Sequence, residues 1–167
     1  MTLRLSKCLL LLAIAFYFTL VVFNNVTDYE SNHQYVRHVL MMDSTFPGNR
    51  GMWRAIDSAR IHTVFYLTII GWEAVTGVLC WWGAARMLRS IKAPGHIFHQ
   101  SKSVAISGLT LGCLLWFLAF LTIGGEWFLM WQSKSWDGRD SAFRLFASLA
   151  LVLLYLSSPE DTPQTRM

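Results

Sequence analysis

The chain has 167 residues, of which 54% are hydrophobic and only 14% are charged. A soluble domain of this size carries nearer a quarter of charged residues, so the composition excludes an ordinary soluble domain. The net charge of +4 is no sign of nucleic-acid binding, because its densest concentration lies in one short loop between two apolar segments. We therefore expect the lipid bilayer, and no nucleic acid, as the main environment of the chain.

Four apolar segments predict four membrane-spanning helices in a single membrane domain over residues 1–167. A helix needs about 20 apolar residues to cross the hydrocarbon core. The first segment lacks a cleavage site at its end, so we expect an uncleaved helix rather than a signal peptide. The expected fold is an all-α integral membrane four-helix bundle, with spans at approximately 8–24, 62–85, 104–128 and 142–158 and an outer loop over 25–61.

The outer loop carries an amphipathic pattern of its own. Asp28, Ser31 or Asn32 can cap a helix there. Apolar residues then recur at helical spacing, opposite a polar face. This pattern predicts a short amphipathic helix within a structured first outer loop, and its apolar face is formed by Tyr35, Val36, Val39 and Leu40.

Glu73 is the residue of the second span whose charged form would cost the most free energy in the membrane. It lies about 17 Å from His62 and about 20 Å from Arg86 at helical rise, which predicts a carboxyl near the bilayer midplane. In one interpretation Glu73 is protonated or hydrogen-bonded and fixes helix register, and in the other it relays protons or cations. Its partner stays open among Thr76 and Tyr66 on the same helix and the polar residues Thr19, Ser148 and Tyr155 of other spans.

Small residues mark the contact that we expect between the second and third spans. Gly108 and Gly112 form a GxxxG pair, and Gly77 lies beside the polar face around Glu73. Small residues let helix backbones approach closely in lipid. At α-helical spacing, Glu126 falls on the same face as the glycine pair, at the outer end of the third span. The other side of that span carries Leu109, Leu114, Trp116, Phe117 and Phe120.

The segments outside the membrane resemble a bacterial family of predicted small integral membrane proteins, a domain of unknown function. The matching residues are Phe23-Asn24-Asn25, Thr27-Asp28-Tyr29, His38-Val39, Met42-Asp43, Thr45-Phe46, Trp53-Arg54, Gly125-Glu126-Trp127-Phe128, Met130-Trp131-Gln132-Ser133 and Trp136. The resemblance covers nearly the whole chain and implies four spans and a bacterial cytoplasmic membrane, with no assigned reaction. Most matching residues fall on the outer side, where we expect Glu126 to bind cap amides or to pair with Arg54 or Arg60. A ligand or partner site around Trp127 is the alternative.

No motif predicts an enzyme, a metal site or a cofactor. His96 and His99 are three residues apart, but no third ligand lies near them in the sequence. The sequence also lacks a phosphate-binding loop and the common hydrolase patterns. We therefore expect a protein that is not an enzyme and holds no metal or cofactor.

The basic residues predict the orientation. Arg86, Arg89, Lys92 and Lys102 lie in the loop between the second and third spans, which contains no acid. Such loops face the cytoplasm, so we expect both termini there. The expected function is that of a non-enzymatic accessory or assembly subunit that binds another membrane protein or a second copy of itself. The alternative is a small proton- or cation-coupled carrier that uses Glu73.

Overall fold

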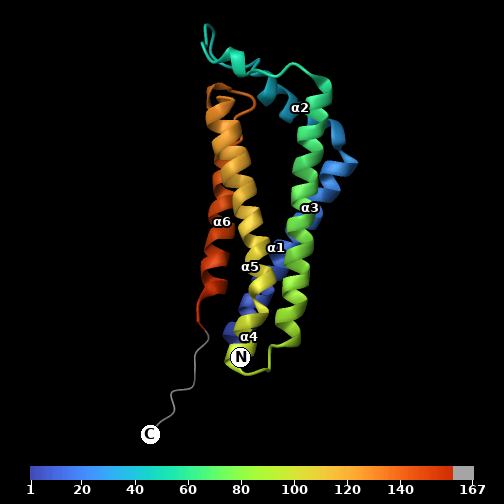
Figure 1. Cartoon of the computed structure of the whole chain (residues 1–167), viewed down its shortest axis with the longest axis vertical. Helices are drawn as coiled ribbons and strands as arrows, with labels where there is room; N and C mark the ends of the chain where they lie inside the picture. Colours follow the sequence, from blue (N-terminus) through green and yellow to red (C-terminus); the bar gives the residue numbers. More distant parts are fainter. Residues whose placement is uncertain (160–167) are drawn as a thin grey trace.

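The computed structural model describes residues 1–159, and every regular element in this part of the chain is a helix. Four helical segments are long and apolar enough to cross a membrane. Figure 1 shows them side by side along the long axis, which confirms the predicted all-α membrane bundle. They are α1 (Thr2–Thr27), α3 (Ala59–Arg89), the segment Gly95–Trp127 and α6 (Arg139–Ser157). Residues 160–167, the last part of the predicted 1–167 domain and its C-terminus, lie outside the described residues.

The third segment consists of three consecutive helices. The short α4 (Gly95–Ser101) precedes α5 (Ser103–Leu114), and the π-helix η2 (Leu115–Trp127) continues it. In η2 the hydrogen bonds reach five residues back, as in the 3.0 Å bond from the Phe128 amide to the Ile123 carbonyl. A π-turn holds more residues than the 3.6 of an α-turn, so a face drawn at α-helical spacing does not continue through η2.

Small residues bring α3 close to its neighbours, as their sequence pattern suggests. A Cβ on Gly83 would lie 2.7 Å from the backbone of Ala105 in α5. Gly108 lies against Cys80 at a corresponding 3.1 Å, whereas Gly77 faces Phe18 of α1 at 3.2 Å. A fully buried apolar core surrounds these contacts. Its members include Leu11, Phe18, Cys80, Ala84, Met87 and Leu109.

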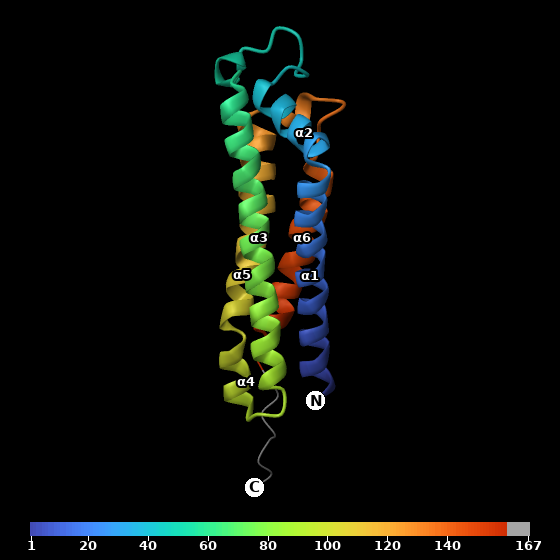
Figure 2. The ribbon, with the colours of Figure 1, turned by 90° about the vertical axis from the view of Figure 1, so that its right-hand side faces the viewer.

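The first outer loop folds into a cap over the outer end of the bundle. It contains α2 (Tyr29–Met41) and the 3₁₀ turn η1 (Met52–Arg54). Figure 2 shows α2 at the upper end of α1, inclined toward α3. The predicted amphipathic helix is confirmed, because α2 buries Val36 and Leu40 while Arg37 on the other face is exposed.

The segment between η2 and α6 completes this cap. It contains the 3₁₀ turn η3 (Met130–Gln132). The Gln132 side chain accepts a hydrogen bond of 3.1 Å from the Phe46 amide, and Ser44 donates one of 2.8 Å to Ser133. Two chain segments that lie far apart in sequence therefore hold one outer layer together.

Candidate functional site

Glu73 lies in a buried hydrogen-bond network between α1 and α3. The Asn25 amide donates a hydrogen bond of 2.6 Å to Oε2 of Glu73. The Tyr66 hydroxyl donates one of 3.0 Å to the Asn25 backbone carbonyl and lies 3.4 Å from Asn25 Oδ1. Glu73 is only 2% exposed, so its side chain faces protein rather than lipid.

Asn25 is a site residue that sequence reasoning missed. The sequence placed it at the start of the outer loop, but α1 continues to Thr27 and carries it toward α3. The available signal was the polar pair Asn24-Asn25 directly after an apolar run, since a polar residue in the last helical turn can face inward. Thr19, Ser148 and Tyr155, the other residues considered on neighbouring helices, bond elsewhere.

The network lies at the outer end of α1, where α1 is followed by α2. A cavity of about 290 Å³ opens there and is lined by residues of α1, α2, α3, η2 and α6. Asn32 of α2 and Ser141 of α6 are exposed lining residues, and they mark its mouth. Glu73 is the only acidic residue of the lining, and the lining includes no Lys, Arg or His.

Trp116 of η2 also lines this cavity. Its side chain is 7% exposed, and its indole ring packs against Phe120 with the ring centroids 4.8 Å apart. Nε1 of Trp116 is buried and has no hydrogen-bond partner among the described residues. A buried donor without a partner costs free energy, so this group is suited to a guest that accepts a hydrogen bond.

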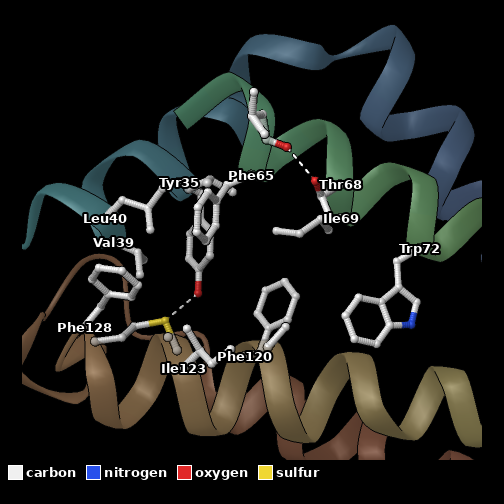
Figure 3. Close-up of a pocket in the computed structure, with 15 residues that line it drawn as sticks. Tyr35, Val39, Leu40, Phe65, Thr68, Ile69, Trp72, Phe120, Ile123 and Phe128 are labelled. Atoms are coloured by element: carbon white, nitrogen blue, oxygen red, sulfur yellow. Dashed lines mark hydrogen bonds between the residues drawn. The ribbon is translucent and has the colours of Figure 1, made fainter. Parts of the chain in front are cut away.

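Tyr35 of α2 is another aromatic residue of the cavity lining. Its hydroxyl donates a hydrogen bond of 2.9 Å to Sδ of Met130, a contact that Figure 3 shows. Burial, reinforced by the nearby Asp137 carboxylate, raises the pKa of Tyr35 to about 12. Tyr35 therefore stays neutral at physiological pH. Hydrogen bonds of 2.9 Å from the Arg139 side chain hold the pKa of Asp137 below its usual value.

A second cavity, of about 250 Å³, lies between α2, α3 and η2 and is shown in Figure 3. Tyr35, Val36, Ile69 and Phe120 line both cavities and so form the wall between them. No charged residue lines the second cavity, and nearly all of its lining is apolar or aromatic. Of these two cavities, only the one that contains Glu73 has a charged residue in its lining.

The bundle is closed on the inner side of Glu73. Thr76, Cys80, Ala84 and Met87 follow along the inner half of α3 and are all fully buried. The Thr76 hydroxyl donates a hydrogen bond of 2.9 Å to the Trp72 carbonyl of its own helix. Inward of Thr76, these α3 residues therefore carry no side-chain oxygen or nitrogen that could continue a polar path from Glu73.

At the outer end, the predicted pairing of Glu126 with Arg54 or Arg60 does not form. Arg54 instead donates a hydrogen bond of 3.0 Å to the Trp127 carbonyl, while Arg60 and Glu126 are both exposed. Glu126 leaves the predicted face because η2 is a π-helix, which shifts the direction of every side chain after Leu115. The Glu126 carboxylate instead acts electrostatically on Arg139 at the start of α6.

Arg54 sits instead among aromatic rings. Its guanidinium carbon lies 5.5 Å from the Trp53 ring centroid and 5.2 Å from that of Trp127. The two indoles meet edge to face at 5.8 Å, and Phe46 meets Trp131 in the same way at 5.8 Å. We call Phe46, Trp53, Trp127 and Trp131 the outer aromatic surface; they are 52%, 74%, 49% and 38% exposed.

Within residues 1–159 there is no group of three His, Cys, Asp or Glu side chains that could hold a metal ion. The three cysteines belong to different helices, Cys8 to α1, Cys80 to α3 and Cys113 to α5. The cavity offers one buried carboxylate, that of Glu73, and one buried indole donor, that of Trp116.

Residues 3–159 match the family model described as "Predicted small integral membrane protein (DUF2165)". No curated protein and no solved structure matches the chain.

Proposed function

The chain belongs to the family of predicted small integral membrane proteins, and we propose that it serves as a non-enzymatic accessory or assembly subunit of a membrane complex. The outer aromatic surface is the observation that carries this proposal. Four large aromatic side chains from two distant segments form two edge-to-face pairs there, one of which, Trp53 with Trp127, flanks Arg54, and Trp53 is 74% exposed. Trp and Arg are the residues most enriched at the energetic centres of protein interfaces.

The position of this surface favours a protein partner over lipid tails. With 31 residues, α3 is about 46 Å long, whereas the hydrocarbon core is about 30 Å thick. The basic residues Arg86 and Arg89 anchor the inner end of α3. The outer end of α3 and η1, which precedes it, therefore lie outside the hydrocarbon core. A juxtamembrane segment of another membrane protein, with aromatic and acidic residues for Trp53 and Arg54, is the partner that fits.

Replacing both Trp53 and Trp127 with alanine should reduce recovery of this partner at least tenfold. The measurement is affinity purification of the tagged protein from its native membranes in mild detergent, with the partner quantified relative to the bait. Trp82→Ala is the matched control, because Trp82 is 55% exposed but lies near the inner end of α3. Recovery of the bait alone, or equal recovery of the partner with the double variant, would contradict the proposal.

We also infer that the protein lies in a bacterial cytoplasmic membrane with its N-terminus and C-terminus in the cytoplasm. The basic residues Arg4, Lys7 and Lys102 gather at the inner end, where Arg4 binds the Ile91 and Ala93 carbonyls. Lys7 and Lys102 both donate to the Ser158 carbonyl at 3.0 Å. A cationic end of this kind favours the cytoplasmic side.

Cysteine labelling of intact cells should show this orientation. In a Cys113→Ala background, where the remaining Cys8 and Cys80 are buried, Ser135→Cys should react with a membrane-impermeant maleimide. Ser103→Cys, exposed at the opposite end, should react only after the cells are opened. Labelling of Ser103→Cys in intact cells would reverse the assignment.

A small proton- or cation-coupled carrier that uses Glu73 is the second candidate. The observation that favours it is the cavity that leads from the outer end to Glu73. A carrier must also release its cargo inward, and the buried Cys80, Ala84 and Met87 offer no polar path. The carrier stays a prediction, and its first requirement is ligand binding in this cavity.

A further inference from the structure

We propose that the cavity between Glu73 and Trp116 is a binding site for a small organic ammonium compound that also carries a hydrogen-bond acceptor. This inference goes beyond the accessory role, because it concerns the interior of the bundle and not the outer aromatic surface. It rests on two buried polar groups of opposite hydrogen-bonding character in one cavity.

Glu73 provides the acceptor for the ammonium group. Its Oε2 receives the Asn25 amide, but no hydrogen bond from residues 1–159 reaches Oε1. One neutral amide does not balance the charge of a buried carboxylate, and buried charges in proteins are normally paired. The lining holds no basic side chain that could supply the missing positive charge. A guest that carries a cation can supply it.

Trp116 provides the donor for the other end of the guest. Its Nε1 is buried, lacks a partner among the described residues, and belongs to the lining of the same cavity. An indole nitrogen only donates hydrogen bonds, so its complement must be an oxygen or another acceptor. A guest that bears only a cation, such as a simple alkylammonium, would leave this donor unpaired.

The residues that line the cavity favour an organic cation over a metal ion as its ligand. Tyr66, Trp116, Phe120 and Tyr35 present aromatic rings, which attract cations through their faces. A metal ion would need further oxygen ligands, but Glu73 is the only acidic residue of the lining. The volume of about 290 Å³ is near the lower end for small-molecule sites. The mouth between Asn32 and Ser141 places the entry at the outer end.

Tyramine is a suitable probe, because it joins an ammonium group to a phenol oxygen through an aromatic body. Its matched control is tyrosol, in which a neutral hydroxyl replaces the ammonium group. Isothermal titration calorimetry on the full chain in detergent should show saturable tyramine binding in the millimolar range or tighter. Tyrosol should bind at least tenfold more weakly, because it cannot form the charge-assisted hydrogen bond to Glu73.

Two variants assign the two halves of the site. Glu73→Gln should weaken tyramine binding at least tenfold and remove the preference over tyrosol. Trp116→Phe keeps the aromatic wall but removes the donor, so it should abolish the advantage of tyramine over phenethylamine, which lacks the phenol oxygen. Trp82→Phe, at the exposed inner end of α3, should bind like the wild type.

The outcomes are decisive even if one variant fails to fold. If Glu73→Gln elutes as an aggregate, the tyramine–tyrosol comparison in the wild type and the Trp116→Phe comparison still test both halves. Absence of saturable tyramine binding to the wild type, or equal affinities for tyramine and tyrosol, would overturn the proposal. Either result would leave the partner experiment on Trp53 and Trp127 unaffected.

Discussion

Replacing Gly83 with leucine should prevent stable assembly of the bundle, and Gly83→Ala should destabilise it by about 1–3 kcal/mol. A Cβ at this position would lie 2.7 Å from N, Cα and Cβ of Ala105, a separation that requires the α3 and α5 backbones to move apart. In lipid, helices associate through close packing and not through a hydrophobic driving force, so the lost contacts have no substitute. The measurement is thermal unfolding in detergent, followed by size-exclusion chromatography.

Gly71 of the same helix is the matched control. It is exposed, and a Cβ there would meet no atom within 4 Å, so Gly71→Ala should be as stable as the wild type or slightly more stable. The comparison separates a steric effect from the intrinsic helix propensity, which is the same for the two substitutions. Unchanged unfolding of Gly83→Leu would show that α3 and α5 do not pack as described.

Replacing Asn25 with leucine should destabilise the protein by about 1–3 kcal/mol, the cost of leaving a buried polar group without its partner. The variant removes the 2.6 Å hydrogen bond to Glu73, and the Glu73 carboxyl is only 2% exposed to alternative donors. Tyr66 keeps the Asn25 backbone carbonyl as its acceptor at 3.0 Å, so the loss is centred on Glu73.

A double variant gives the sharper measurement. Replacing both Asn25 and Glu73 with leucine removes donor and acceptor together, so it should be more stable than Asn25→Leu alone. Asn24→Leu is the control, because Asn24 is exposed on the neighbouring position of α1. Additive effects of the two single replacements, measured as denaturation midpoints in a double-mutant cycle, would contradict the described contact.

The amphipathic helix α2 and the inward direction of Glu73 follow from periodicity. Val36 and Leu40 recur at helical spacing, and both are buried where the pattern predicts. The polar and small residues around Glu73 mark one face of α3, which lies against α1 and α5. A spacing of residues along one helix is enough to identify a face, because helix geometry is fixed.

The hydrogen-bond partner of Glu73 required the tertiary structure. Asn25, near the end of α1, contacts both Tyr66 and Glu73 of α3, a relation that depends on how far the two helices slide past each other. The glycine contacts set this relation, and no local pattern in α1 encodes it. The sequence therefore predicted a polar neighbour for Glu73 but left its identity open.

The exposed position of Glu126 has a different cause. Glu126 lies near the end of η2, where the change from α- to π-helical bonding has redirected the side chains, so it is exposed although α-helical spacing puts it on the packing face. The placement of Trp116 opposite the glycine pair was wrong for a simpler reason: Trp116 follows Gly112 by four residues and so shares its side of the helix, and it is buried in the lining of the cavity that contains Glu73. The hydrophobic pattern of this run is nearly uniform, so it contains no signal for the change of period.

The sequence by itself determined that this chain is an all-α membrane protein with four apolar spans, an amphipathic outer helix and an inward-facing acid, since these depend on composition and on local periodicity. Only the tertiary structure decided which groups meet: Asn25 with Glu73, Arg54 with the two indoles, and Trp116 with an outward-opening cavity. These contacts depend on how the helices are shifted and rotated relative to one another. Close backbone contacts and the π-helical segment determine those shifts and rotations across the whole bundle.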